Sequence, residues 1–231
     1  MKKIYILISI FSINTIAADY EPYESSYEPL PYTNTIFKNA NIYDGDGKEF
    51  IETDIIIQNG KIIAIGKDLP KSNELTTVDA TDKWITPGII DIHSHMGVYP
   101  APGVKTSSDG NEATSPVTAE VWAEHSIWTQ DPQFALALKG GVTTFHVLPG
   151  SANLIGGRGV TAKNLQRNTI NSMKFPNAPH SLKMACGENP KRVYGSRGQA
   201  PSTRMGNIAG YRKSWIKAES YLSKLDEYEA K

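Results

Sequence analysis

Two histidines one residue apart are the clearest chemical feature of this sequence. His93 and His95 end the segment Trp84-Ile-Thr-Pro-Gly-Ile-Ile-Asp-Ile-His-Ser-His95. Because side chains alternate along a β-strand, both imidazoles are expected on the same side. A catalytic zinc site takes three protein ligands plus a water. The pair therefore predicts part of a metal site at the C-terminal end of a buried strand; the alternative is a surface His-x-His.

The elements expected around this pair alternate between strand and helix patterns. Apolar runs predict a first strand at residues 85–95, a second at 142–148 and a third at 181–186. Asp131 and Pro132 are typical of the N-cap and first position of a helix, which Gly140 would end. A short helix is expected within residues 118–128, and a glycine-rich loop at 155–159. This alternation predicts a parallel α/β architecture.

Residues 35–84 have a different pattern, made of short β segments. Asn59-Gly60 separates two apolar runs and favours the type I′ turn of a β-hairpin. Another strand is expected at residues 76–79. These segments predict a small β-sandwich module with no catalytic role.

The N-terminus predicts export. Residues 1–18 combine Lys2 and Lys3, a short apolar run and Ala17-Ala18, as in a cleaved signal peptide. The apolar run is too short for a membrane-spanning helix, and an uncleaved anchor is the alternative. A periplasmic or extracellular location follows. Residues 19–34, with Tyr-Glu-Pro at 20–22 and 27–29, predict a disordered leader that acts as a linker rather than a binding arm.

Composition excludes several classes of protein. The net charge is +0, and no long basic or acidic block favours nucleic acid or a membrane surface. A single cysteine, Cys186, excludes an intramolecular disulfide and is expected to be a buried strand residue. Near the C-terminal end, apolar residues spaced by three and four describe one face of a helix, which needs a partner surface: Ile208, Tyr211, Trp215, Ala218, Leu222 and Leu225.

In combination, several motifs resemble the amidohydrolase superfamily, in particular the exported, imidazolonepropionase-related branch. The resemblance runs from about residue 35 to the last residue. The motifs that carry it are Asn39-Ala-Asn-Ile-Tyr-Asp-Gly45, Ile57-Gln-Asn-Gly-Lys-Ile-Ile-Ala-Ile-Gly66, Thr86-Pro-Gly-Ile-Ile-Asp-Ile-His-Ser-His95, Gly140-Gly-Val-Thr-Thr144, Leu148-Pro-Gly-Ser-Ala-Asn-Leu-Ile-Gly-Gly157 and Gly187-Glu-Asn-Pro190.

The resemblance implies the N-terminal portion of a (β/α)8 TIM-like barrel, preceded by part of a β-sandwich. Active sites of such barrels lie at the C-terminal ends of the strands. It implies a divalent metal, zinc in the first place, held by His93, His95 and Glu188. Related enzymes have a carboxylate or a carboxylated lysine at the third position. Lys183 is not favoured there, because it is expected at the wrong end of its strand.

Other polar residues are expected to have structural or substrate-binding roles rather than to bind the metal. His125 and His180 are expected to be structural, and His146 to lie in the core or behind the ligands. Arg192, Tyr194 and Arg197 follow Glu188 and are candidates for binding a substrate carboxylate, since guanidinium binds carboxylates in a bidentate manner. A solvated basic loop, which also contains Lys191, is the alternative reading of this segment.

The sequence departs from the family pattern after Glu188. It contains no later histidine, and its only later aspartate, Asp226, lies on the C-terminal helix. Residues 85–231 are therefore expected to form only the first three βα units, with no catalytic base in this chain. The predicted function is metal-dependent hydrolysis of carbon–nitrogen bonds in small molecules or dipeptides, by a chain inactive alone. The alternative is a non-catalytic fragment, or a subunit that associates with the missing C-terminal half.

Overall fold

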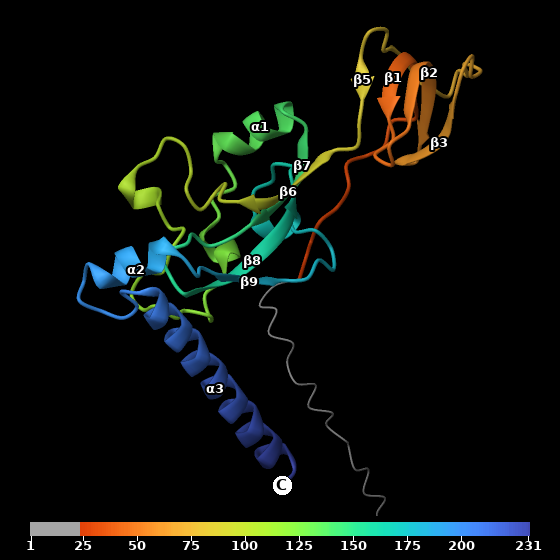
Figure 1. The fold of residues 1–231 in the computed structure, drawn as a ribbon. Helices are drawn as coiled ribbons and strands as arrows, with labels where there is room; N and C mark the ends of the chain where they lie inside the picture. The colour runs from red at the N-terminus through yellow and green to blue at the C-terminus, as the bar shows by residue number, and fades with distance from the viewer. Residues whose placement is uncertain (1–23) are drawn as a thin grey trace, which may run out of the picture.

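The computed structural model describes residues 24–231, so the expected signal peptide lies outside the described residues. The chain forms two separate β-sheets, followed by a long C-terminal helix (Figure 1). The first sheet has the strand order β3-β2-β1-β4, with β5 also paired to β1, and the second has the order β6-β7-β8-β9. Within residues 24–231, no helix is both long and apolar enough to cross a membrane.

The first sheet contains the predicted hairpin. β1 (Thr35–Tyr43) pairs antiparallel with β2 (Glu49–Gln58), which pairs antiparallel with β3 (Lys61–Gly66). The turn residues Asn59 and Gly60 both have positive φ, of 50° and 71°, as a type I′ turn requires. β4 (Thr76–Asp79) and β5 (Trp84–Ile85) run parallel to β1. A small core of Ala40, Ile42, Ile55 and Ala80 joins these strands.

The second sheet is mixed, not wholly parallel. β6 (Ile89–Ser94) and β7 (Val142–Val147) are parallel, as predicted. β8 (Ile155–Lys163) replaces the expected glycine-rich loop and runs antiparallel to both β7 and β9 (Ser181–Met184). Among the described residues, the segment between β7 and β9 contains the strand β8 and no α-helix, so the prediction of three consecutive βα units is wrong.

A glycine explains why the start of β8 looked like a loop. Gly157 has φ of +104°, and a Cβ atom there would lie 2.3 Å from the carbonyl oxygen of Val121. Only glycine allows this close approach of two backbone segments. The glycines that predicted a loop therefore belong to a strand that packs tightly against another segment.

The helices follow the predictions unevenly. α1 (Pro132–Lys139) begins where predicted, because the Asp131 side chain accepts a hydrogen bond from the Gln133 amide. The helix expected within residues 118–128 is only a 3-10 turn, Ala123–Ser126. Two further 3-10 turns are Lys105–Ser107 and Ile170–Ser172. After β9 come α2 (Glu188–Gly195) and α3 (Arg204–Glu229).

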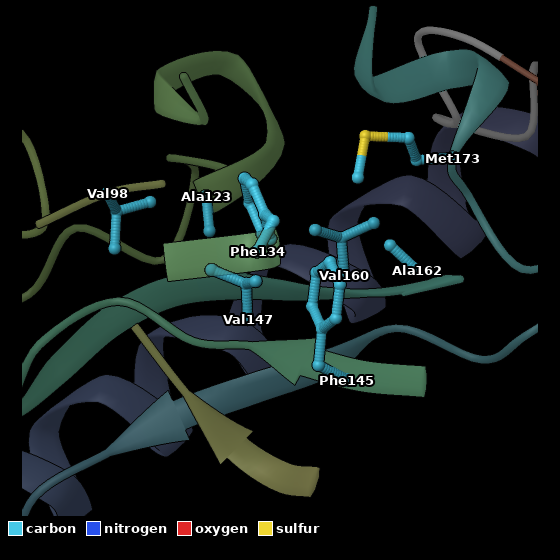
Figure 2. Packing of buried hydrophobic residues seen from close by; sticks show 8 residues of the cluster. All are labelled: Val98, Ala123, Phe134, Phe145, Val147, Val160, Ala162 and Met173. Carbon is cyan, nitrogen blue, oxygen red and sulfur yellow. The ribbon is translucent and has the colours of Figure 1, made fainter. Parts of the chain in front are cut away.

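The main core lies on one face of the second sheet. Phe134 of α1 stacks on Phe145 of β7, with 5.1 Å between ring centroids. Figure 2 shows the eight buried residues of this cluster: Val98, Ala123, Phe134, Phe145, Val147, Val160, Ala162 and Met173. Since side chains alternate along β7, His146 points to the opposite face of the sheet.

β6 differs from its prediction. The sequence favoured a buried strand, but Ile89, Ile90 and Ile92 are 53%, 64% and 77% exposed. β6 forms one edge of the second sheet, and among the described strands it pairs with β7 alone. An apolar strand is buried only when both of its faces are covered, which the described residues do not provide.

The described part of the leader contacts the second sheet region. The Ser25 hydroxyl donates to the carbonyl oxygen of Lys174 (2.8 Å), and the Ser26 amide donates to that of Asn171 (3.0 Å). Arg167 donates to the carbonyl of Glu28 (3.3 Å). Residues 24–33 have no regular secondary structure, and these hydrogen bonds hold the segment against the protein.

Candidate metal-binding site

His95 has the orientation expected of a metal ligand. Its Nδ1 lies 2.8 Å from the carbonyl oxygen of Leu148, just beyond β7. A carbonyl can only accept, so Nδ1 carries the proton and Nε2 keeps its lone pair. Metal-binding histidines are usually fixed in this way by a carbonyl or carboxylate. The ring meets those of His93 and Tyr99 edge-on, with centroid distances of 5.2 and 5.8 Å.

His93 lies beside a lysine that the sequence analysis set aside. Its Nε2 is 3.1 Å from Nζ of Lys183, and its backbone amide donates to Oδ1 of Asp91. The charge of Lys183 lowers the pKa of His93, burial and His95 lower it further, and Asp91 raises it. Burial also lowers the pKa of Lys183, which is only 8% exposed. Lys183 is thus at the histidine end of β9, and the prediction that it lay at the wrong end is wrong.

The contact joins two strands that are not neighbours in the second sheet. β6 and β9 are separated by two strands, and adjacent strands are about 4.8 Å apart, so a flat sheet would place them about 14 Å apart. The long side chain of Lys183 nevertheless reaches His93. Polar side chains from β6, β7 and β9 therefore gather on the face opposite the main core.

His146 lies on the same face of the sheet. Its Nδ1 is 2.9 Å from Oγ1 of Thr161, and its Nε2 is 2.6 Å from Oγ of Ser181. Burial lowers the pKa of His146, and the neighbouring His180 and His93 lower it further. Both ring nitrogens of His146 are thus within hydrogen-bonding distance of hydroxyl groups.

Glu188 is not brought to the histidines. It is the first residue of α2, its side chain is 77% exposed, and Oε1 lies 3.5 Å from Nε of Arg192. Within residues 24–231, no group of three or more His, Cys, Asp or Glu side chains could hold a metal ion. The third residue that the structure places beside the pair is Lys183.

The three candidate substrate-binding residues have separate surroundings. Tyr194 is fully buried and donates its hydroxyl to the carbonyl of Ser115 (2.6 Å), which argues against a substrate contact and for a packing role. Arg197 donates to the carbonyl of Ala113 (2.6 Å). Arg192 is exposed and pairs with Glu188. The structure does not place these three around one site.

The remaining sequence candidates have structural surroundings. His125 is an exposed residue, 3.6 Å from Oε1 of the buried Glu124. His180 lies within hydrogen-bonding distance of the Gly159 carbonyl, and its ring contacts Trp122. Cys186 was expected to be buried but is exposed, because β9 ends at Met184.

A cavity of about 480 Å³ lies among the loops that follow β6 and β7. Carboxylates rim it, and Trp122 and His125 form part of its wall. Neither histidine of the pair lines it, and neither do the three candidate substrate-binding residues. The polar residues that line it include Asp109, Asn111, Glu112, Glu120 and Ser126.

Two features of the structure were not predicted from the sequence. One is Lys183, although strand alternation places Ser181 and Lys183 on one face of β9 and so carried a usable signal. The other is a buried ion pair under the loops: Nζ of Lys174 lies 2.6 Å from Oε2 of Glu124, and both side chains are at most 6% exposed. No spacing rule joins two residues so far apart in the sequence.

Comparison with known proteins gives several amidohydrolase relatives, although no protein-family model matches the chain. "Amidohydrolase tasK" from Hapsidospora irregularis is 32% identical over 213 residues, which cover 87% of this chain and 21% of that protein. A dihydroorotase from Ligilactobacillus salivarius is 42% identical over 72 residues, which cover 30% of this chain and 15% of the enzyme. The crystal structure of an amidohydrolase from Thermotoga maritima MSB8 has a TM-score of 0.76 at 40% identity.

These matches support placement in the amidohydrolase superfamily. The Thermotoga structure covers 83% of this chain, whereas the chain covers 49% of that protein. The chain therefore spans about half the length of this amidohydrolase and about a fifth of the length of tasK.

Proposed function

We propose that this chain carries the metal-binding residues of a metal-dependent hydrolase. The substrates would be amides or cyclic amides in small molecules or short peptides, and the ion would be zinc. Similarity to amidohydrolases supports hydrolysis of carbon–nitrogen bonds. The observation that carries the proposal is the placement of Lys183 beside His93, with His95 already fixed in the tautomer that leaves Nε2 free.

His93, His95 and Lys183 fit a divalent ion on the condition that Lys183 is uncharged. His95 is ready to bind, but Nε2 of His93 is also the atom that Lys183 contacts. A charged ammonium group there would repel a cation, whereas a neutral amine can attack carbon dioxide, lose a proton and become a carbamate. Burial lowers the pKa of Lys183 and so favours the neutral amine. A carbamate oxygen would then be the third ligand, in place of the predicted Glu188.

The surrounding residues would orient this set. The Leu148 carbonyl holds the tautomer of His95, and the Asp91 carboxylate holds the backbone of His93. Thr161 and Ser181 hold His146 beneath them. When bound, a divalent ion polarises a substrate carbonyl and lowers the pKa of water. We assign no general base among the described residues.

Zinc binding tests the proposal directly. Calorimetric titration of the metal-free chain with zinc in bicarbonate buffer should give one site per chain, and His93→Ala or Lys183→Ala should weaken it by about 10-fold or more. His125→Ala, which removes an exposed histidine elsewhere, is the matched control and should leave binding unchanged. Carbon-13 NMR with labelled bicarbonate should show a carbamate signal that Lys183→Ala removes. Absence of zinc binding by the folded chain would refute the proposal.

The exposed face of β6 supports a second candidate, a subunit that completes its sheet with another polypeptide. An edge strand with unpaired backbone groups and three exposed isoleucines can pair with a further strand. Substituting Ile90 by Lys should abolish such pairing while leaving zinc binding intact. Pairing that survives this change would exclude β6 as the contact.

Export and the imidazolonepropionase-related branch are also proposals. They rest on the pattern of residues 1–18 and on the sequence motifs. N-terminal sequencing of the protein recovered outside the cytoplasm tests export: cleavage after Ala17 or Ala18 supports it, and a retained Met1 argues against it.

A further inference from the structure

Among residues 24–231, the hydrogen bonds that join α3 to the rest of the protein lie near its start. The Asn207 side chain donates to the carbonyls of Cys186 and Gly187, and the Tyr211 hydroxyl donates to that of Ala185. The rest of the 26-residue helix extends away from both sheets (Figure 1). Trp215 and Leu222 are 51% and 56% exposed. A long helix with bulky exposed apolar residues needs a further partner.

Apart from Met205, Ala209, Ile216, Tyr221 and Tyr228, the apolar residues of α3 follow the spacing of a coiled-coil seam. Starting at Ile208, they recur at intervals of three and four along almost the whole helix. This is the a and d pattern of a heptad repeat, which packs against another helix of the same type. The a positions are Ile208, Trp215 and Leu222, and the d positions are Tyr211, Ala218 and Leu225.

Charge divides the same helix into two halves. The first half, up to Lys217, contains four basic residues and no acid. The second half contains Lys224 and four acids, Glu219, Asp226, Glu227 and Glu229. A second copy of this helix, turned end for end, therefore matches it in charge over its whole length.

We infer that α3 binds α3 of a second copy of this chain as an antiparallel coiled coil. In this register, Ile208 faces Leu225 of the second copy and Tyr211 faces its Leu222. The largest residue of the seam, Trp215, faces the smallest, Ala218 of the second copy. Because the pairing is symmetric, each contact occurs twice, and all six apolar positions are matched.

The same register pairs opposite charges beside the apolar layers. Arg204 faces Glu229 of the second copy in the terminal layer. Arg212 and Glu219 occupy e positions, and in an antiparallel pair they flank the same interval between layers. Parallel pairing offers neither contact: it places Trp215 against Trp215 and Arg204 against Arg204. Charge therefore selects the antiparallel arrangement.

The oligomeric state of the whole chain tests this inference. Sedimentation analysis at micromolar concentration should show a dimer. Arg212→Glu puts like charges opposite each other at two symmetric positions and should weaken the dimer about 10-fold or more. Glu219→Arg should do the same, and the double variant should restore the wild-type affinity. Lys213→Glu makes the same charge change on the outer face and is the matched control.

Orientation is tested by distance. In a Cys186→Ser background, a spin label at Ala230→Cys should give a separation of about 40 Å or more in the antiparallel dimer, because the two helix ends are far apart. A parallel pair would bring the labels within about 20 Å. Circular dichroism checks that each variant keeps its helix. A monomer at all concentrations, a dimer unaffected by the charge changes, or a short label distance would each overturn the inference.

Discussion

Nζ of Lys183 lies 3.1 Å from Nε2 of His93, although 90 residues separate the two in the sequence. The charge of Lys183 is the largest cause that lowers the pKa of His93. Replacing Lys183 with Met should therefore raise the pKa of His93 in the metal-free protein toward the ordinary value of about 6.5. NMR titration of the imidazole signals measures this shift, with His125 as the internal control. An unchanged titration of His93 would show that the two side chains do not interact in solution.

The buried ion pair of Glu124 and Lys174 should be essential to stability. Lys174→Met would leave a carboxylate that is 1% exposed without its lysine, and should lower the free energy of unfolding by about 3–5 kcal/mol. Adding Glu124→Gln should recover part of this loss, because the remaining side chain is uncharged. Urea unfolding followed by tryptophan fluorescence measures both variants. Lys139→Met, at an exposed lysine of α1, is the control and should change little.

Acid should weaken the first sheet through Asp54. Burial opposes ionisation of this carboxyl, but hydrogen bonds from Lys38 and from the amides of Asn39 and Leu69 outweigh it and keep its pKa below the ordinary value. A carboxyl whose pKa is lower in the folded state than in the unfolded state stabilises the folded protein at pH values above the unfolded-state pKa of about 3.9. This stabilisation is lost as the pH falls toward the folded-state pKa.

The variant Asp54→Asn makes this pH dependence measurable. The stability difference between wild type and variant should be largest above about pH 4 and should shrink as the pH is lowered further. Hydrogen exchange of the β1 and β2 amides, measured across this range, reports on the first sheet alone. A difference that stays constant with pH would contradict the role assigned to Asp54.

The main core should depend on one phenylalanine of α1. Phe134 is completely buried against Phe145 (Figure 2), so Phe134→Ala should cost about 3–5 kcal/mol in the free energy of unfolding. Leu136→Ala, on the same helix but at a position 64% exposed, should change it by no more than about 0.5 kcal/mol. Thermal unfolding compares the two directly. Equal effects would mean that α1 does not pack as described.

The sequence by itself determined the features that local chemistry controls. Asn59 and Gly60 specify a hairpin, because a type I′ turn needs two residues that tolerate positive φ. Asp131 and Pro132 specify where α1 begins, since the Asp131 side chain accepts from the Gln133 amide. His93 and His95 share a side through strand alternation alone. Each of these signals involves residues close together in the chain.

Only the tertiary structure decided the contacts made across the second sheet. Gly156, Gly157 and Gly159 predicted a loop, because glycines in a row are typical of a loop and also of a strand that packs closely on another segment, here Val121. The order of the strands in the sheet, which no single strand encodes, brought Lys183 to the face that carries His93 and left Glu188 on an exposed helix turn. Burial likewise depended on the tertiary structure: isoleucines typical of a buried strand are exposed on the edge strand β6, because the described residues do not cover both of its faces.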